Sequence, residues 1–145
     1  MNVGRLVAAA VVAWLVAIGL GYAVNEVLLA GLYDANAAAF RPEAALMAKL
    51  PYGFGVMLVA LLAFTFMYAK GYEGGNGVME GLRFGLLVGL IVCGFGTVWY
   101  YVTIPITKEL GFAMLADSIV EPAIYGAIVG AIYQPKVALA AAARV

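Results

Sequence analysis

The sequence predicts an all-α transmembrane fold in which four antiparallel helices span a membrane. Hydrophobic residues make up 66% of the 145-residue chain and charged residues 11%, whereas soluble domains carry about 45–50% apolar and about 25% charged residues. Four apolar stretches reach the roughly 20 residues that a spanning helix needs. None of them shows the alternation expected of a transmembrane β-barrel. Residues 1–145 are therefore expected to form a single transmembrane domain.

The first expected helix covers residues 3–32 and is retained in the mature protein. Arg5 followed by an apolar run and then Gly21-Tyr22-Ala23 imitates a signal peptide with its cleavage site. The apolar run, however, is longer than the core of a typical signal peptide and continues past Ala23 to Leu32. We therefore expect a spanning helix here.

The other three expected helices cover residues 52–69, 77–104 and 112–133. The glycine-rich segment 71–77 favours a tight antiparallel hairpin between the second and third helices. An alanine-rich piece within residues 33–49 can form a short interfacial helix. Pro135 is expected to end the fourth helix, because proline removes a backbone donor and clashes with the preceding turn.

Basic residues predict the orientation of the chain. Four spans put both termini and the second loop on one side of the membrane. That side carries five basic residues and the other side three, which favours cytoplasmic termini in a cell membrane. The two groups are Arg5, Lys70, Arg83, Lys136 and Arg144, against Arg41, Lys49 and Lys108.

The residue types that are missing exclude several functions. The chain has no histidine, and Cys93 is its only cysteine. An intrachain disulfide, a His-ligated haem, a Cys/His zinc site and Ser-His catalysis are therefore excluded. Zero net charge gives no indication of nucleic-acid binding. We predict no cofactor, no metal site and no catalytic residue, and enzymatic activity is not expected.

Glycines at four-residue spacing predict where helices pack closely. Gly81, Gly85 and Gly89 lie on one face of the third helix, and Gly126 and Gly130 lie on one face of the fourth. Small residues at this spacing let helix backbones approach each other in a membrane. Packing within the chain is the simplest interpretation, and a dimer seam or contact with a larger complex is the alternative.

Charged residues on these two helices lie opposite the glycines. At about 100° per residue, Arg83 is opposite the glycine face of the third helix, and Asp117 and Glu121 are opposite that of the fourth. A lone four-helix bundle does not easily bury both faces of these helices. Either the charges reach the membrane interface, or a partner covers one face.

Glu80 and Arg83 are three residues apart near the start of the third helix, so they can form an ion pair on one helical face. The arginine can also extend to lipid headgroups. A structural ion pair or topology anchor is one interpretation, and a site for a lipid phosphate or a substrate anion is the other.

Ionisable residues inside spanning helices are costly and are candidate functional residues. Glu26, Asp117 and Glu121 fall in the same half of the membrane, with Lys49 on the same side as a counter-charge. We expect these four residues to form one polar cluster. Pro122 leaves the Ser118 carbonyl without its helical donor, which adds an acceptor for a cation or proton. A structural network and a transport site both remain open.

Two segments of the chain resemble a known group of proteins. Lys70-Gly71-Tyr72-Glu73-Gly74 is followed by Gly81-Leu82-Arg83-Phe84-Gly85-Leu86, and Glu121 precedes Tyr125-Gly126-Ala127-Ile128-Val129-Gly130. The order of these features resembles small bacterial four-span integral membrane proteins of unknown function. The resemblance implies a fold and carries no activity with it.

Three functions are compatible with this pattern. A structural or accessory subunit, working as a homo-oligomer or with other membrane subunits in membrane lipid, explains the small size and the two-faced helices. The alternative is a small transporter or channel for a proton, cation or small metabolite that uses the acidic cluster. A lipid-active enzyme whose carboxylates hold a metal is the third reading, and the lack of histidine makes it the weakest.

Overall fold

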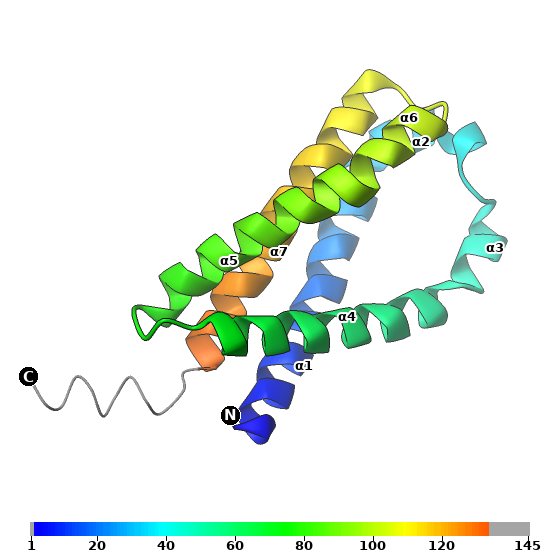
Figure 1. Ribbon diagram of the computed structural model, residues 1–145. Helices are drawn as coiled ribbons and strands as arrows, with labels where there is room; N and C mark the ends of the chain where they lie inside the picture. Colours follow the sequence, from blue (N-terminus) through cyan, green and yellow to red (C-terminus); the bar gives the residue numbers. More distant parts are fainter. Residues whose placement is uncertain (1, 134–145) are drawn as a thin grey trace, which may run out of the picture.

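The computed structural model describes residues 2–133, and in this part of the chain it contains helices and no strand. Figure 1 shows their arrangement. The predicted all-α fold is confirmed. The elements are α1 (Val3–Tyr22), η1 (Ala23–Leu28), α2 (Ala30–Ala35), η2 (Ala37–Ala39), α3 (Glu43–Met47), α4 (Leu50–Gly71), α5 (Gly77–Val92), η3 (Cys93–Thr97), α6 (Val98–Thr103) and α7 (Lys108–Ile132).

Four helical runs in the described residues are long and apolar enough to cross a membrane. They are α1 with η1 (Val3–Leu28), α4, α5 with η3 and α6 (Gly77–Thr103), and α7. The fold is thus compatible with a multi-pass membrane protein. The short helices η2 and α3 lie in the segment where an interfacial helix was expected. Pro135 lies outside the described residues.

Two helix boundaries differ by four residues from the sequence expectation, and the others differ by at most two. The first long run ends at Leu28, and α2 follows as a separate helix. The last helix begins at Lys108, four residues earlier than expected, because Thr107 caps it. The Thr107 hydroxyl accepts from the Leu110 amide at 3.5 Å. Such a cap satisfies a backbone donor at a helix start, and hydropathy alone does not reveal it.

Helices α5 and α7 pack together along their glycines, as predicted for packing within the chain. A Cβ atom on Gly81 would collide with the Gly126 carbonyl, and one on Gly85 would lie 2.7 Å from the Ala123 Cα atom. Gly89 lies against Ile119 in the same way. The two backbones are therefore close enough that only hydrogen fits between them, which increases dispersion contact where lipid provides no hydrophobic force.

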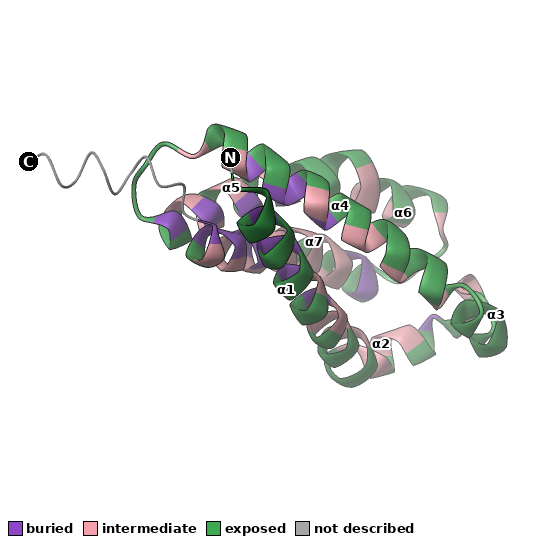
Figure 2. Ribbon diagram, turned by 90° about the horizontal axis from the view of Figure 1, so that it is seen from below, coloured by how far each residue is buried: buried purple, intermediate pink, exposed green. Residues whose placement is uncertain are grey.

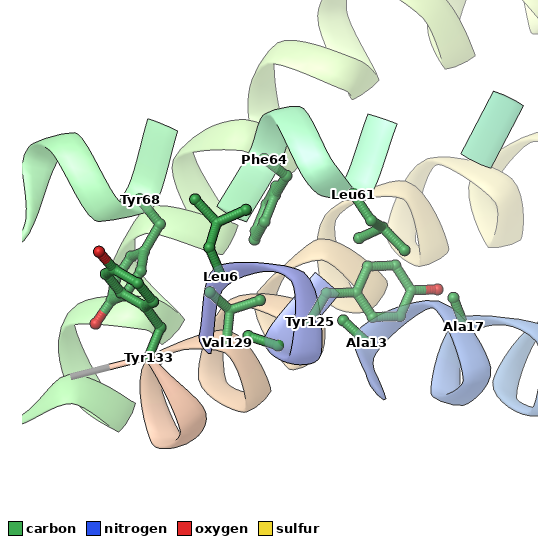
Figure 3. Close-up of a cluster of buried hydrophobic side chains, with 10 residues drawn as sticks. Leu6, Ala13, Ala17, Leu61, Phe64, Tyr68, Tyr125, Val129 and Tyr133 are labelled. Carbon is green, nitrogen blue, oxygen red and sulfur yellow. The ribbon is translucent and has the colours of Figure 1, made fainter. Parts of the chain in front are cut away.

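The opposite side of α7 packs against α1 and α4, so this helix is central in the bundle. Figure 3 shows Tyr125 of α7 beside Ala13 and Ala17 of α1 and Leu61 of α4. The expectation that one bundle cannot bury both faces of the fourth helix is therefore wrong for α7. Small alanines on α1 allow the close approach that buries this second face.

Buried residues are concentrated in one half of the bundle. Most of them lie in helix segments 3–17, 61–71, 77–89 and 123–132, which we call the packed half, whereas a smaller buried group lies at the other end of the bundle and contains Asn36, Leu110 and Gly111. The described segments 18–28, 50–60, 90–103 and 112–122 contain no buried residue, and we call them the open half. Figure 2 shows this contrast along α1 and α4, and Figure 1 shows that the first part of α4 diverges from α7.

Candidate functional site

Glu121 lies close to the middle of the central helix. It is thirteen residues after Lys108 and eleven before Ile132, at the boundary between the packed and open halves. At 1.5 Å per residue, about 20 Å of helix precedes it and about 16 Å follows it. Because α7 starts earlier than expected, this carboxylate lies further from the start of its helix than the sequence suggested.

The two oxygens of the Glu121 carboxylate have different surroundings. Oε2 accepts a hydrogen bond from the Tyr125 hydroxyl at 2.5 Å, one turn further along α7. Oε1 is buried and has no hydrogen-bond partner among the described residues. A buried acceptor without a partner is costly. This oxygen can therefore take up a proton or bind a donor group from a ligand.

Two further carboxylates and a tyrosine lie near this group. Burial raises the pKa of Tyr33, and the negative charges of Asp117, Glu121 and Glu26 act in the same direction. Tyr33, at the outer end of α2, is thus within electrostatic reach of all three carboxylates. Asp117 is half-buried and Glu26 is exposed. All three predicted acidic residues thus act electrostatically on a tyrosine that the sequence reasoning missed.

Lys49 does not join this arrangement as a counter-charge. It is exposed at the start of α4, and among the described residues it forms no ion pair. The divergence of α4 from α7 (Figure 1) is the physical reason, because it carries the lysine away from the acidic residues. The sequence predicts which side of the membrane Lys49 occupies and does not predict the tilt of its helix.

The Ser118 carbonyl is likewise not part of the acidic group. It lies against Gly89 of α5 on the glycine side of α7, whereas Asp117 and Glu121 project from the other side. The helix continues through Pro122 without interruption. The carbonyl that proline deprives of its donor is thus covered by the neighbouring helix.

Two π-helical turns occur in the open half. One of them, η1, contains Glu26, and the other, η3, packs against α7. Such turns are rare, and they occur frequently at functional sites. Their presence in two of the four long helices distinguishes this half of the bundle from the packed half.

At the outer end of the open half, the Asn36 side chain joins the loop after α2 to the loop before α7 by hydrogen bonds. This side chain is 6% exposed. The Thr107 amide donates to Asn36 Oδ1 at 2.7 Å, and Asn36 Nδ2 donates to the Thr107 hydroxyl at 3.2 Å. Sequence reasoning missed this pair, since 71 residues separate its members and no local motif connects them.

Glu80 and Arg83 do not form the predicted ion pair. Glu80 instead accepts hydrogen bonds from the amides of Glu73, at 3.1 Å, and Gly75 in the α4–α5 loop. Two backbone donors within reach of one carboxylate satisfy it without the arginine. Arg83 is exposed and has no partner among the described residues. Its use as an anion or lipid anchor stays a prediction.

No group of three or more His, Cys, Asp or Glu side chains among residues 2–133 could hold a metal ion. In comparisons with protein-family models, curated proteins and solved structures, nothing matches this chain. The resemblance to small bacterial four-span membrane proteins therefore stays a prediction, and the function of the acidic group is inferred from its geometry.

Proposed function

We propose that this chain is a structural or accessory subunit of a membrane assembly, either a homo-oligomer or a complex with other membrane proteins. In this proposal the open half forms the contact with the partner. The chain resides in a cell membrane with both termini on the cytoplasmic side, in agreement with the excess of basic residues there.

The observation that carries the proposal is the position of the acidic residues. Glu26 and Asp117 lie in the helix segments 18–28 and 112–122, which contain no buried residue. Apolar side chains in such segments need only lipid around them. Carboxylates inside a membrane almost always face protein or water, because lipid cannot hydrogen-bond them. A partner that covers the open half would give these groups a polar environment.

Glycines on two helices of the open half support the same conclusion. Gly19 on α1 and Gly55 on α4 are exposed, and a Cβ atom built on either would meet no atom within 4 Å. The glycines of the α5–α7 seam are needed for packing within the chain, whereas these two are not. Small residues on an outer face allow another helix to approach closely.

The test is native mass spectrometry of the purified full chain in a mild detergent. We expect a stable oligomer or constant co-purified subunits. Gly19→Leu combined with Gly55→Leu should weaken that assembly at least about tenfold, because two bulky groups would enter a close helix contact. Gly71→Leu is the matched control, since Gly71 is also an exposed α4 glycine with no atom within 4 Å but lies in the packed half.

Two outcomes would overturn the proposal. One is a wild-type chain that is monomeric both in detergent and in lipid nanodiscs at micromolar concentration. The other is assembly that is equally strong in the Gly19→Leu/Gly55→Leu variant and in wild type. Equal thermal stability of the variants in detergent verifies that the substitutions leave the monomer fold intact.

A second candidate function is the passage of protons or small cations along the acidic residues. The observation that favours it is the buried, unpartnered Oε1 atom of Glu121 near the centre of α7. Proton relays in membranes use carboxylates in such positions. Asp117, one turn away, and Tyr33 would continue the path toward the membrane surface.

Proteoliposomes that enclose a pH-sensitive dye test this second function. Wild type should carry a proton flux driven by a potassium diffusion potential, and Glu121→Gln should abolish it. Glu109→Gln is the matched control, because Glu109 is an exposed carboxylate in the first turn of the same helix. Wild-type flux no greater than that of empty liposomes, or full flux in Glu121→Gln, would rule the function out.

A further inference from the structure

A pocket of about 260 Å³ lies at the packed end of the bundle, far from the acidic residues of the open half. It is formed where the α4–α5 loop meets the first turns of α5. Its lining combines one basic residue, two acidic residues and apolar side chains. The lining residues are Tyr68, Gly71, Glu73, Glu80, Arg83, Phe84 and Leu87.

The loop that forms one wall of this pocket is held in place by hydrogen bonds. Glu80 accepts from the Glu73 amide at 3.1 Å, and the Tyr72 hydroxyl donates to the Gly75 carbonyl at 2.8 Å. Gly74 has a φ of 97°, a conformation that favours glycine. Glu80 is thereby a positioning residue, because its bond to the Glu73 backbone fixes where the Glu73 side chain begins.

Two opposite charges line the pocket without pairing with each other. Glu73 and Arg83 are both exposed, and neither side chain has a hydrogen-bond or ion-pair partner among the described residues. Lys70, the other cation near this end, is directed elsewhere, with its ammonium 5.6 Å from the centre of the Phe66 ring. A ligand that carries both charges can therefore bind between Glu73 and Arg83.

The depth of these groups matches the headgroup region of a membrane. Glu73 is in the loop, and Arg83 is six residues, or about 9 Å, beyond the start of α5. A long arginine side chain at that depth extends toward the phosphate layer. Leu87 follows one turn deeper on the same face, and the exposed Leu90 and Ile91 continue below it. Apolar surface thus leads from the pocket into the hydrocarbon region.

We propose that this pocket binds one zwitterionic phospholipid whose headgroup carries a primary ammonium. Arg83 donates hydrogen bonds to the phosphate, and the Glu73 carboxylate accepts from the ammonium. An acyl chain lies along Leu87, Leu90 and Ile91. A primary ammonium has three donors for the carboxylate, whereas a trimethylated ammonium has none. The second carboxylate, on Glu80, disfavours a headgroup with net negative charge. This inference is independent of the proposed assembly.

Lipid titration of the detergent-purified full chain, followed by native mass spectrometry, tests the proposal. Dioleoylphosphatidylethanolamine should bind at least about fivefold more tightly than the phosphatidylcholine or phosphatidylglycerol with the same chains. Arg83→Gln should weaken phosphatidylethanolamine binding about tenfold, because a charge-assisted hydrogen bond to the phosphate is lost. Glu73→Gln should remove the preference over phosphatidylcholine and leave phosphatidylcholine binding unchanged.

Lys70→Gln is the matched control, since it removes a nearby cation that does not line the pocket, and it should bind like wild type. Arg83→Lys retains the charge and should keep more affinity than Arg83→Gln. Unchanged binding in Arg83→Gln, or phosphatidylglycerol binding as tight as that of phosphatidylethanolamine, would overturn the proposal. Binding of soluble phosphoethanolamine as tightly as the complete lipid would overturn the assignment to a membrane lipid. Unaltered melting temperatures verify that the exposed substitutions do not unfold the chain.

Discussion

The same four long helices build both the packed half and the open half of this bundle, but the two halves carry different kinds of residue. The packed half is joined by glycines of α5 and α7 and by alanines of α1, with aromatic side chains between them. The open half carries Glu26, Asp117 and both π-helical turns. Tight packing and polar chemistry are thus separated along the helices.

This separation has a physical reason. Close helix packing in a membrane depends on backbones that approach each other, and an ionised side chain between them would have to be desolvated. Glu121 lies at the boundary between the two halves, and the two oxygens of its carboxylate have different surroundings. One of its oxygens is hydrogen-bonded to Tyr125 of the packed half, and the other is buried without a partner.

The largest expected effect is the contrast between two separate glycine-to-alanine substitutions, one in each half. Gly85→Ala should destabilise the fold by about 3 kcal/mol, because its Cβ atom would overlap the α7 backbone. Gly55→Ala, where a Cβ atom meets nothing within 4 Å, should stabilise α4 by up to about 1 kcal/mol. The free energy of unfolding, measured by SDS titration in mixed micelles, checks both. Equal effects would contradict the division into two halves.

Asn36 is expected to have the next largest effect, confined to the open half. Asn36→Leu leaves the Thr107 amide without its acceptor, which should cost about 2 kcal/mol. Hydrogen exchange should accelerate at residues 30–36 and 107–111 and stay unchanged in segments 77–89 and 123–132. Asn25→Leu is the control, because the Asn25 side chain bonds only within its own helix, to the Gly21 carbonyl at 2.8 Å. Acceleration across all four segments would mean that the halves do not open separately.

Tyr125→Phe probes the boundary between the halves and should cost about 1 kcal/mol. The substitution removes the hydrogen bond to Glu121 Oε2 and leaves the second oxygen of that carboxylate unpartnered as well. SDS titration measures the loss. Tyr22→Phe, at an exposed tyrosine, should change the free energy of unfolding very little. A neutral Tyr125→Phe would indicate that water replaces the hydroxyl at the boundary.

The smallest expected effect is that of Lys49→Gln. Because Lys49 is exposed and forms no ion pair among the described residues, its neutralisation should alter the free energy of unfolding by less than about 0.5 kcal/mol. A loss above about 2 kcal/mol in the same titration would restore Lys49 as the counter-charge of the acidic group and place α4 closer to α7.

Sequence reasoning identified the glycine contact between the third and fourth helices because its signal is local. Four-residue spacing places glycines on one helical face whatever the neighbour is. The same reasoning misplaced Lys49 and the Glu80–Arg83 pair. The position of Lys49 depends on the tilt of α4. The partners of Glu80 depend on a loop conformation that brings two backbone amides to its carboxylate. Neither follows from the spacing of residues along one helix.

The sequence by itself determined the four apolar helices, the tight turn between the second and third, and the residues that carry charge inside them. These follow from hydropathy and spacing, because the number and length of apolar helices depend on each stretch separately. Only the tertiary structure decided which faces meet and where packing stops. Nearly every face of such helices is apolar, so hydropathy does not choose among them. The choice is made by shape, through the glycines and alanines that let two backbones come together.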